Sequence, residues 1–224
     1  MIETGVLFDD IHSFRDLNLV LAPFVLVPAK PKTNFIEVPG RDGSIDATES
    51  TGKVTYNDRE FSFTFTVFPQ DDLTFEERQT VVSNALNGKR CKITIEKDPD
   101  YYLMGRCTVN EYFANKKLRQ IVVSVRTEPY KMKQHETIMT FDLAEGEQRQ
   151  IILPNGKKSV VPTIEVSGEV QIINSYGYSN TFAEETVKDL NFCLHEGANI
   201  LTLNAVNVIE DVANVTFIYR EGDL

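Results

Sequence analysis

Histidines and cysteines are the residues most often used as nucleophiles, bases or metal ligands, and this chain has three of each. They are His12, His135, His195, Cys91, Cys107 and Cys193. None stands at the spacing of a His-Glu-x-x-His, Gly-x-Ser-x-Gly or Cys-x-x-Cys motif. Cys193 and His195 would share one face of a strand, but no further ligand accompanies them. We therefore expect no catalytic residues, no metal site and no cofactor.

Two pairs of aspartates could serve as the acids of a glycosidase. Asp71 and Asp72 are adjacent, and Asp98 and Asp100 flank a proline. Glycoside hydrolysis needs two carboxyl groups at a defined separation across the scissile bond. Nothing in the sequence sets such a separation, and acidic turns are common. We interpret both pairs as turn residues and expect that the protein is not an enzyme.

An aromatic group lies in and beside the Ser- and Asn-rich stretch of residues 174–181. Its members are Tyr176, Tyr178 and Phe182. Aromatic rings beside asparagine can bind sugars, so these three residues are candidate sugar contacts. The same pattern also arises from plain packing of a turn, which is the commoner case, and the sequence leaves both readings open.

The most distinctive stretch is Pro39-Gly40-Arg41-Asp42-Gly43, followed by Ser-Ile-Asp. Two glycines three apart, one directly after proline, predict a tight loop with positive φ angles. The loop is not a phosphate-binding loop, because the spacing of that motif is absent and no helix pattern follows. A plain strand connection would explain it. The alternative is a loop that docks on a neighbouring subunit, with Arg41 as a planar donor to a partner carboxylate.

The run Leu17–Val27 is almost entirely apolar. Such a run predicts a strand buried on both faces or one that meets another subunit, and Pro23 predicts an edge, a bulge or a break. Leu19 and Leu21 therefore join Pro39–Gly43 as candidate interface residues. Lys89, Arg90 and Lys92 form a small basic cluster, which is either ordinary solvated surface or a docking patch for an acidic neighbouring ring.

Hydrophobic periodicity predicts a mainly β protein with one helix. Thr74 and Glu77 form a capping box, Val81, Val82, Ala85 and Leu86 give an apolar stripe, and Gly88 ends the helix. Phe61, Phe63 and Phe65 alternate with polar residues in the clearest strand. Further strands are predicted at 33–38, 91–97, 101–115, 118–127, 137–143, 150–153, 160–166, 170–174, 190–194, 199–204 and 214–220.

Composition points to two domains of different charge. The chain has 224 residues and a net charge of −10. Residues 1–133 have a net charge of −1, whereas residues 134–224 have −9. We expect a domain boundary there. The acidic balance argues against a nucleic-acid binder, and the sequence shows neither a signal peptide nor a membrane span. We expect a soluble protein made in the cytoplasm.

Several motifs together resemble the distal tail protein (Dit) family of long-tailed siphophages and prophages. They are Leu7–Ile11, Pro39–Gly43 with Asp46, Glu128–Lys131, Asn155-Gly156 and Pro162–Gly168. In the first motif Asp10 stands where the family usually has glycine. The resemblance implies an N-terminal β-barrel or sandwich-type domain with one helix, followed by a β-sandwich similar to galectins and carbohydrate-binding modules.

The same resemblance implies a function in the virion. Family members form a ring of six subunits that joins the tail tube to the tail-tip or baseplate proteins. The second domain would project outward and carry receptor-binding proteins or touch cell-wall sugar. On this basis we expect a virion structural protein at the tail tip, with the tail tube protein, a tail-associated protein and a receptor-binding protein as partners, and no role for membrane or nucleic acid. The alternative is a monomeric carbohydrate-binding module for cell-surface polysaccharide.

Overall fold

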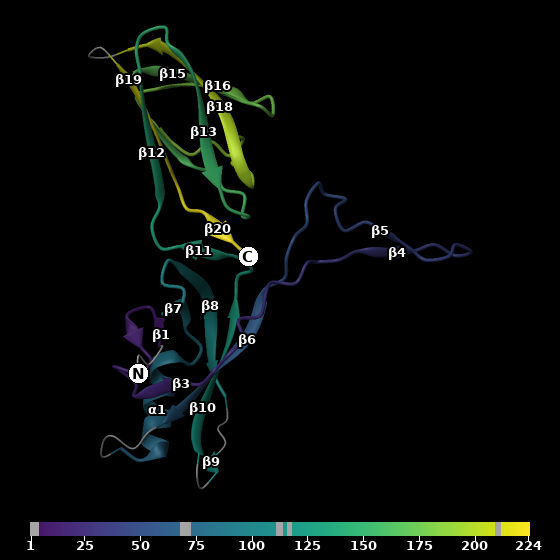
Figure 1. The fold of residues 1–224 in the computed structure, drawn as a ribbon, viewed down its shortest axis with the longest axis vertical. Coiled ribbons are helices and arrows are strands. Elements are labelled where there is room, and N and C mark those ends of the chain that lie inside the picture. The colour runs from purple at the N-terminus through teal and green to yellow at the C-terminus, as the bar shows by residue number, and fades with distance from the viewer. Residues whose placement is uncertain (1–4, 68–72, 111–113, 116–117, 209–211) are drawn as a thin grey trace. The chain divides into compact units, whose positions relative to one another are not determined.

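The computed structural model describes residues 5–67, 73–110, 114–115, 118–208 and 212–224. The protein is mainly β, as the sequence predicts. The chain divides into two compact units, one of Met1–Lys131 with Leu224 and one of Met132–Asp223. We call them unit 1 and unit 2 and describe each by itself (Figure 1). Among the described residues, no helix is long and apolar enough to cross a membrane.

Unit 1 is built on one antiparallel sheet with the strand order β2-β1-β7-β8-β10-β6-β3. Its elements are β1 (Val6–Phe8), β2 (Ile11–His12), β3 (Leu19–Leu21), β4 (Phe35–Glu37), β5 (Ser44–Asp46), β6 (Arg59–Val67), α1 (Phe75–Leu86), β7 (Arg90–Ile95), β8 (Tyr101–Val109), β9 (Ala114–Asn115) and β10 (Leu118–Thr127). β9 pairs with β10, and β4 pairs with β5 outside the main sheet.

The core of unit 1 forms against β6. Phe61, Phe63 and Phe65 are buried, and the residues between them face outward, so the predicted alternation is confirmed. Phe8 meets Phe63 edge to face, with ring centroids 6.0 Å apart. Each large apolar side chain buried in this way contributes about 1.5–3 kcal/mol to stability. The aromatic face of β6 therefore holds the rest of the sheet in place.

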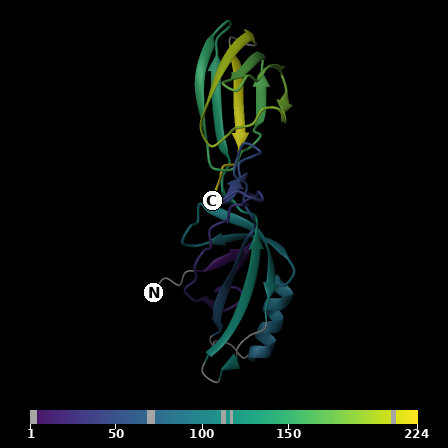
Figure 2. The same cartoon turned by 90° about the vertical axis from the view of Figure 1, so that its right-hand side faces the viewer.

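The predicted helix is present as α1 and lies along one side of the sheet (Figure 2). The capping box is confirmed: the Glu77 N–H donates to Thr74 Oγ1, and the Thr74 N–H donates to the Glu77 carboxylate. Val82 and Leu86 are fully buried in the core. Val81 is exposed, so its predicted place in the apolar stripe is wrong. The buried face continues instead through Arg78 and Phe75, one and two turns before Val82.

The apolar run Leu17–Val27 is not one long strand. Only Leu19–Leu21 form β3, at the edge of the sheet beside β6. The strand ends before Pro23, as the missing N–H of proline predicts. Phe24, Leu26 and Val27 continue without strand pairing and pack against the core as partly buried side chains. The run is apolar because it covers the core as an irregular segment.

Unit 2 is a β-sandwich whose two sheets have the strand orders β12-β19-β14-β17 and β13-β18-β15-β16. Its strands are β11 (Lys131–Lys133), β12 (Thr137–Leu143), β13 (Gln148–Asn155), β14 (Thr163–Ser167), β15 (Glu169–Asn174), β16 (Ser179–Ala183), β17 (Thr186–Val187), β18 (Gly197–Asn207), β19 (Ala213–Tyr219) and β20 (Gly222–Asp223). Phe192, Leu201, Val215 and Phe217 are among the side chains buried between the sheets.

In unit 2 one predicted strand is absent, and strand β16 is not predicted. Residues 190–194, predicted as a strand, form a loop with a single bridge between Leu194 and Val160. The apolar pattern arises because Phe192 and Leu194 are buried in the core from this loop. The stretch around Phe182 contains strand β16, which is not among the strands that the sequence predicts. Independent folding of the two units stays a prediction, which we develop in the Discussion.

Candidate interaction surfaces

Residues 31–46 form an exposed hairpin in unit 1, and we call this segment the arm. Every residue in it is exposed. β4 and β5 pair with each other in a two-stranded sheet of their own (Figure 1). Where the arm leaves the body of unit 1, two hydrogen bonds join the start of the arm to the returning chain at residues 55–57. Lys32 N–H donates to the Thr55 carbonyl and Asn57 N–H donates to the Lys30 carbonyl, each at 2.8 Å.

Local sequence explains the hairpin. Gly40 and Gly43 have φ angles of 82° and 72°, which side chains with a Cβ rarely adopt, so the predicted glycine turn is confirmed. The Arg41 N–H closes the turn by donating to the Val38 carbonyl. At the other end Thr48 Oγ1 accepts from the Asn34 N–H at 3.1 Å. These contacts set the register in which Ile36 faces Ile45.

The arm presents an aliphatic face to solvent. Ile36, Val38 and Ile45 are 47%, 39% and 41% exposed, and the register and the twofold period of a strand place them on the same side. On the opposite side Phe35 is also exposed, beside Glu37 and Asp46. A two-stranded hairpin is at best marginally stable alone in water. The arm therefore has the character of a surface that another molecule covers.

The candidate interface residues divide into two groups. Pro39–Gly43 lie at the tip of the arm, and Arg41 and Asp42 are exposed, as the docking interpretation requires. Leu19 is fully buried in the core of its own unit, so its assignment to an interface is wrong. Leu21 is partly buried against the same core. The sequence does not identify Ile36, Val38 and Ile45 as interface residues. Their alternation with polar residues predicts a strand with one apolar face, but it does not show whether that face packs on the chain's own core or is exposed.

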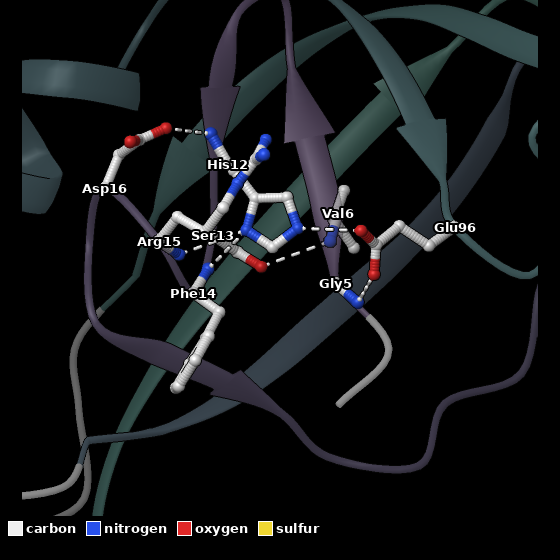
Figure 3. Close-up of polar contacts among 8 residues, drawn as sticks. All are labelled: Gly5, Val6, His12, Ser13, Phe14, Arg15, Asp16 and Glu96. Carbon is white, nitrogen blue, oxygen red and sulfur yellow. Dashed lines mark hydrogen bonds and ion pairs between the residues drawn. The ribbon is translucent and has the colours of Figure 1, made fainter. Parts of the chain in front are cut away.

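One cluster of catalytic-looking residue types surrounds His12 (Figure 3). His12 Nδ1 accepts hydrogen bonds from the N–H groups of Phe14 and Arg15, each 3.1 Å long. Nδ1 therefore carries no proton, and Nε2 carries the ring proton and donates it to Glu96 at 2.9 Å. Both ring nitrogens are used, and the ring is buried. The imidazole holds the turn after β2 in place.

The side chains around His12 also accept hydrogen bonds from backbone N–H groups. Ser13 Oγ accepts from the Val6 N–H, and the Asp16 carboxylate accepts from the His12 N–H (Figure 3). Glu96 accepts from the Gly5 N–H at 2.6 Å. Among the described residues, the nearby His12 and Asp16 side chains are both occupied by backbone N–H groups, so neither is aligned as a base for the Ser13 hydroxyl. We read the cluster as the clasp that ties the β1–β2 hairpin to the end of β7.

Glu96 is expected to make the folded state sensitive to acid. The hydrogen bonds from Gly5 and His12 lower the pKa of Glu96 below its ordinary value of 4.5. The folded state therefore binds fewer protons than the unfolded state near that pH, so this contribution is present above it and is lost as the pH falls. Urea unfolding of Glu96→Gln should show a shallower loss of stability on acidification than the wild type. The exposed Glu49→Gln is the control and should lose stability on acidification as the wild type does. If Glu96→Gln also shows the same dependence of stability on pH as the wild type, the proposed role of Glu96 in the clasp is contradicted.

The aromatic group in unit 2 does not form one exposed platform. Phe182 is 3% exposed and belongs to the core, so its assignment as a sugar contact is wrong. The Tyr178 ring lies against Phe192, and its hydroxyl donates a hydrogen bond to Asp189 at 2.6 Å. Burial is the main cause that raises the pKa of Tyr178, and the bond to Asp189 raises it further. Only Tyr176 has a largely free ring, which meets the His195 ring at 5.0 Å. One free tyrosine is little support for a sugar site.

The other candidate groups have structural positions. Cys91 and Cys107 are buried, and burial raises the pKa of the Cys107 thiol to about 12, which leaves it unreactive at neutral pH. Asp98 accepts from the Lys131 ammonium at 2.7 Å, while Asp71 and Asp72 lie outside the described residues. Within the described part of the chain, no group of three His, Cys, Asp or Glu side chains could hold a metal ion.

The fold is similar to that of a solved structure, the Dit protein (gp 19.1) of SPP1. The likeness covers 97% of this chain and 98% of that chain, with a TM-score of 0.64 and 12% sequence identity. SPP1 Dit is described as a paradigm of the hub adsorption apparatus in phages that infect Gram-positive bacteria. No protein-family model and no curated protein matches the chain. The resemblance to distal tail proteins inferred from sequence motifs is thus confirmed at the level of the fold.

Proposed function

We propose that this chain is a structural subunit of a phage tail tip and assembles into a ring of six. In this proposal the ring joins the tail tube to the tail-tip or baseplate proteins and the receptor-binding protein, in a siphophage or prophage. Unit 1 forms the ring, and unit 2, a galectin-like sandwich, faces outward. The fold shared with SPP1 Dit supports the structural role.

The observation that carries the proposal is the arm. A hairpin with an exposed aliphatic face needs a partner surface. The same arm is unsuited to a monomeric carbohydrate-binding module, which would have no use for it. A second copy of the chain is the simplest partner, because a repeated head-to-tail contact closes into a ring when its rotation divides a full turn.

Negative-stain electron microscopy of the purified full chain tests the proposal. We expect closed rings with six-fold symmetry, whose number increases with protein concentration. Light scattering on the same sample should give a mass of about six chains, as the closed ring requires. A chain that stays monomeric up to the solubility limit would overturn the ring.

Arg41→Ala should weaken this assembly without unfolding the chain. Arg41 is exposed at the arm tip, and its loss costs a charge-assisted contact at an interface. We expect half-assembly to need about tenfold more protein, which corresponds to about 1.4 kcal/mol. Sedimentation equilibrium measures this shift, with the exposed Arg149→Ala of unit 2 as the matched control. Equal assembly of all three proteins would exclude a role for Arg41.

A further inference from the structure

Three arginines lie in a row across the outer face of the unit 1 sheet. The strand register places Arg90 of β7 opposite Arg106 of β8, and Arg106 opposite Arg126 of β10. Side chains directly opposite one another on neighbouring strands are in contact range, and like charges there are destabilising. The sheet itself gains nothing from this arrangement. A row of this kind needs carboxylates close by to offset the repulsion.

The two outer arginines have carboxylate partners within unit 1. Arg90 pairs with Glu128 at 2.5 Å, and Arg126 pairs with Asp58 at 2.9 Å. Arg106, in the middle, donates from Nη1 to the backbone carbonyl of Gly88 and forms no ion pair with a carboxylate in the described part of the chain. Its guanidinium has five donors. Arg106 therefore keeps both charge and hydrogen-bonding capacity for a ligand.

The row borders an open hollow on this face of the sheet. Small hydroxyl side chains line it beside the arginines, and two of them, Ser62 and Ser124, hydrogen bond to each other at 2.8 Å. Thr108 and Met104 lie in the same hollow. Long arginines standing beside short serines leave room for an extended chain to lie across the sheet. The acidic residues Asp58, Glu60 and Glu128 border the same hollow.

We propose that the arginine row receives the arm of a second copy of this chain, with the carboxylates of Asp42 and Glu37 binding at Arg106. This inference rests on the ring proposed above. The arm tip carries Glu37, Arg41 and Asp42, all exposed. The row offers the complementary pattern, because Arg106 takes the carboxylates and the exposed Glu60, which lies 3.8 Å from Arg126, takes Arg41. Charge complementarity of this kind sets the partner and the register of an interface.

Reach and symmetry agree with this assignment. The ten residues from Lys32 to Arg41 are joined by nine peptide bonds and span about 30 Å when extended, which is comparable with the diameter of a small domain. The arm and the row are different surfaces, and every copy of the chain has both. A contact between them is heterologous, and such a contact closes into a ring when the rotation per subunit divides a full turn.

Charge reversal at Arg106 tests the proposal in the full chain. Arg106→Glu should raise the concentration for half-assembly at least tenfold, and adding Asp42→Arg or Glu37→Arg should restore most of the loss. Arg149→Glu on unit 2 makes the same charge change and should have no effect. Circular dichroism and thermal melting check the fold, and Arg106→Gln serves as a milder variant if the reversal unfolds the chain. The assignment would be overturned if both Arg106 variants assembled like the wild type. It would also be overturned if neither Asp42→Arg nor Glu37→Arg restored the assembly of Arg106→Glu.

A mixing experiment tests the contact directly. In a Cys193→Ser background, chains with Asp42→Cys and chains with Arg106→Cys are mixed and treated with a short bismaleimide. We expect a cross-linked pair that contains one chain of each kind and is absent when Arg149→Cys replaces Arg106→Cys. A different outcome would separate the two proposals. If the arm variants prevent assembly, but the Arg106 variants assemble normally and no cross-link forms, the ring proposal is supported and the arginine row is excluded as the binding site of the arm. A wild-type chain that stays monomeric overturns both.

Discussion

Ile36→Asp combined with Ile45→Asp is expected to abolish assembly while the monomer keeps its fold. The two side chains face each other on the arm and are about half exposed, so they make few contacts within their own chain. Burial of a large aliphatic side chain is worth about 1.5–3 kcal/mol, and a buried carboxylate adds a desolvation cost. We expect the concentration for half-assembly to rise at least a hundredfold, which is about 2.8 kcal/mol. Analytical ultracentrifugation measures this shift.

Two controls separate loss of contact from other effects. Ile138→Asp with Ile152→Asp places the same charges at similarly exposed isoleucines of unit 2 and should leave assembly unchanged. Ile36→Thr with Ile45→Thr keeps the strand propensity of the arm but removes apolar surface, and it should give an intermediate loss. The melting temperature should stay within about 2 °C of the wild type, since exposed substitutions seldom change stability much. Normal rings from the aspartate variant would exclude the aliphatic face as the contact.

Elements with strong local signals could be predicted from the sequence. The capping box at Thr74 and Glu77 satisfies the first N–H groups of α1 within four residues, so nothing distant is needed to start the helix. The alternation along Phe61–Phe65 likewise identifies a strand and its buried face. The glycines at 40 and 43 specify the turn of the arm, because positive φ is a property of single residues.

Features that depend on long-range pairing could not be predicted in this way. Hydrophobicity alone does not distinguish a strand from an irregular covering segment, so the apolar run Leu17–Val27 predicts a strand with a break at Pro23 but not the irregular path of residues 22–27. Exposure of Ile36 and burial of Phe182 depend on what packs nearby. The row Arg90-Arg106-Arg126 exists only because β7, β8 and β10 pair in one register. Sequence showed Arg90 as part of a basic cluster but gave no reason to place it beside arginines 16 and 36 positions later.

Residues 1–131 alone are expected to form the ring, whereas residues 132–224 alone are expected to be a folded monomer. Each fragment matches one compact unit with its own buried core. The charge of −1 on residues 1–133 allows copies of unit 1 to approach, and the arm belongs to this unit. The charge of −9 on residues 134–224 makes close packing of unit 2 copies unfavourable. Moving the boundary to Lys131 transfers only one charged residue, Lys133.

Light scattering and calorimetry on the two fragments test which unit forms the ring and whether each unit folds by itself. Residues 1–131 should reach the mass of a closed ring, and residues 132–224 should stay monomeric and melt in one cooperative transition. Limited proteolysis of the full chain should first cut near residues 130–136. Added salt should strengthen rings of the full chain if repulsion between copies of unit 2 opposes assembly, and should weaken rings of residues 1–131 if charge pairs at the arm tip hold them. A monomeric first fragment together with an oligomeric second fragment would reverse the roles of the two units.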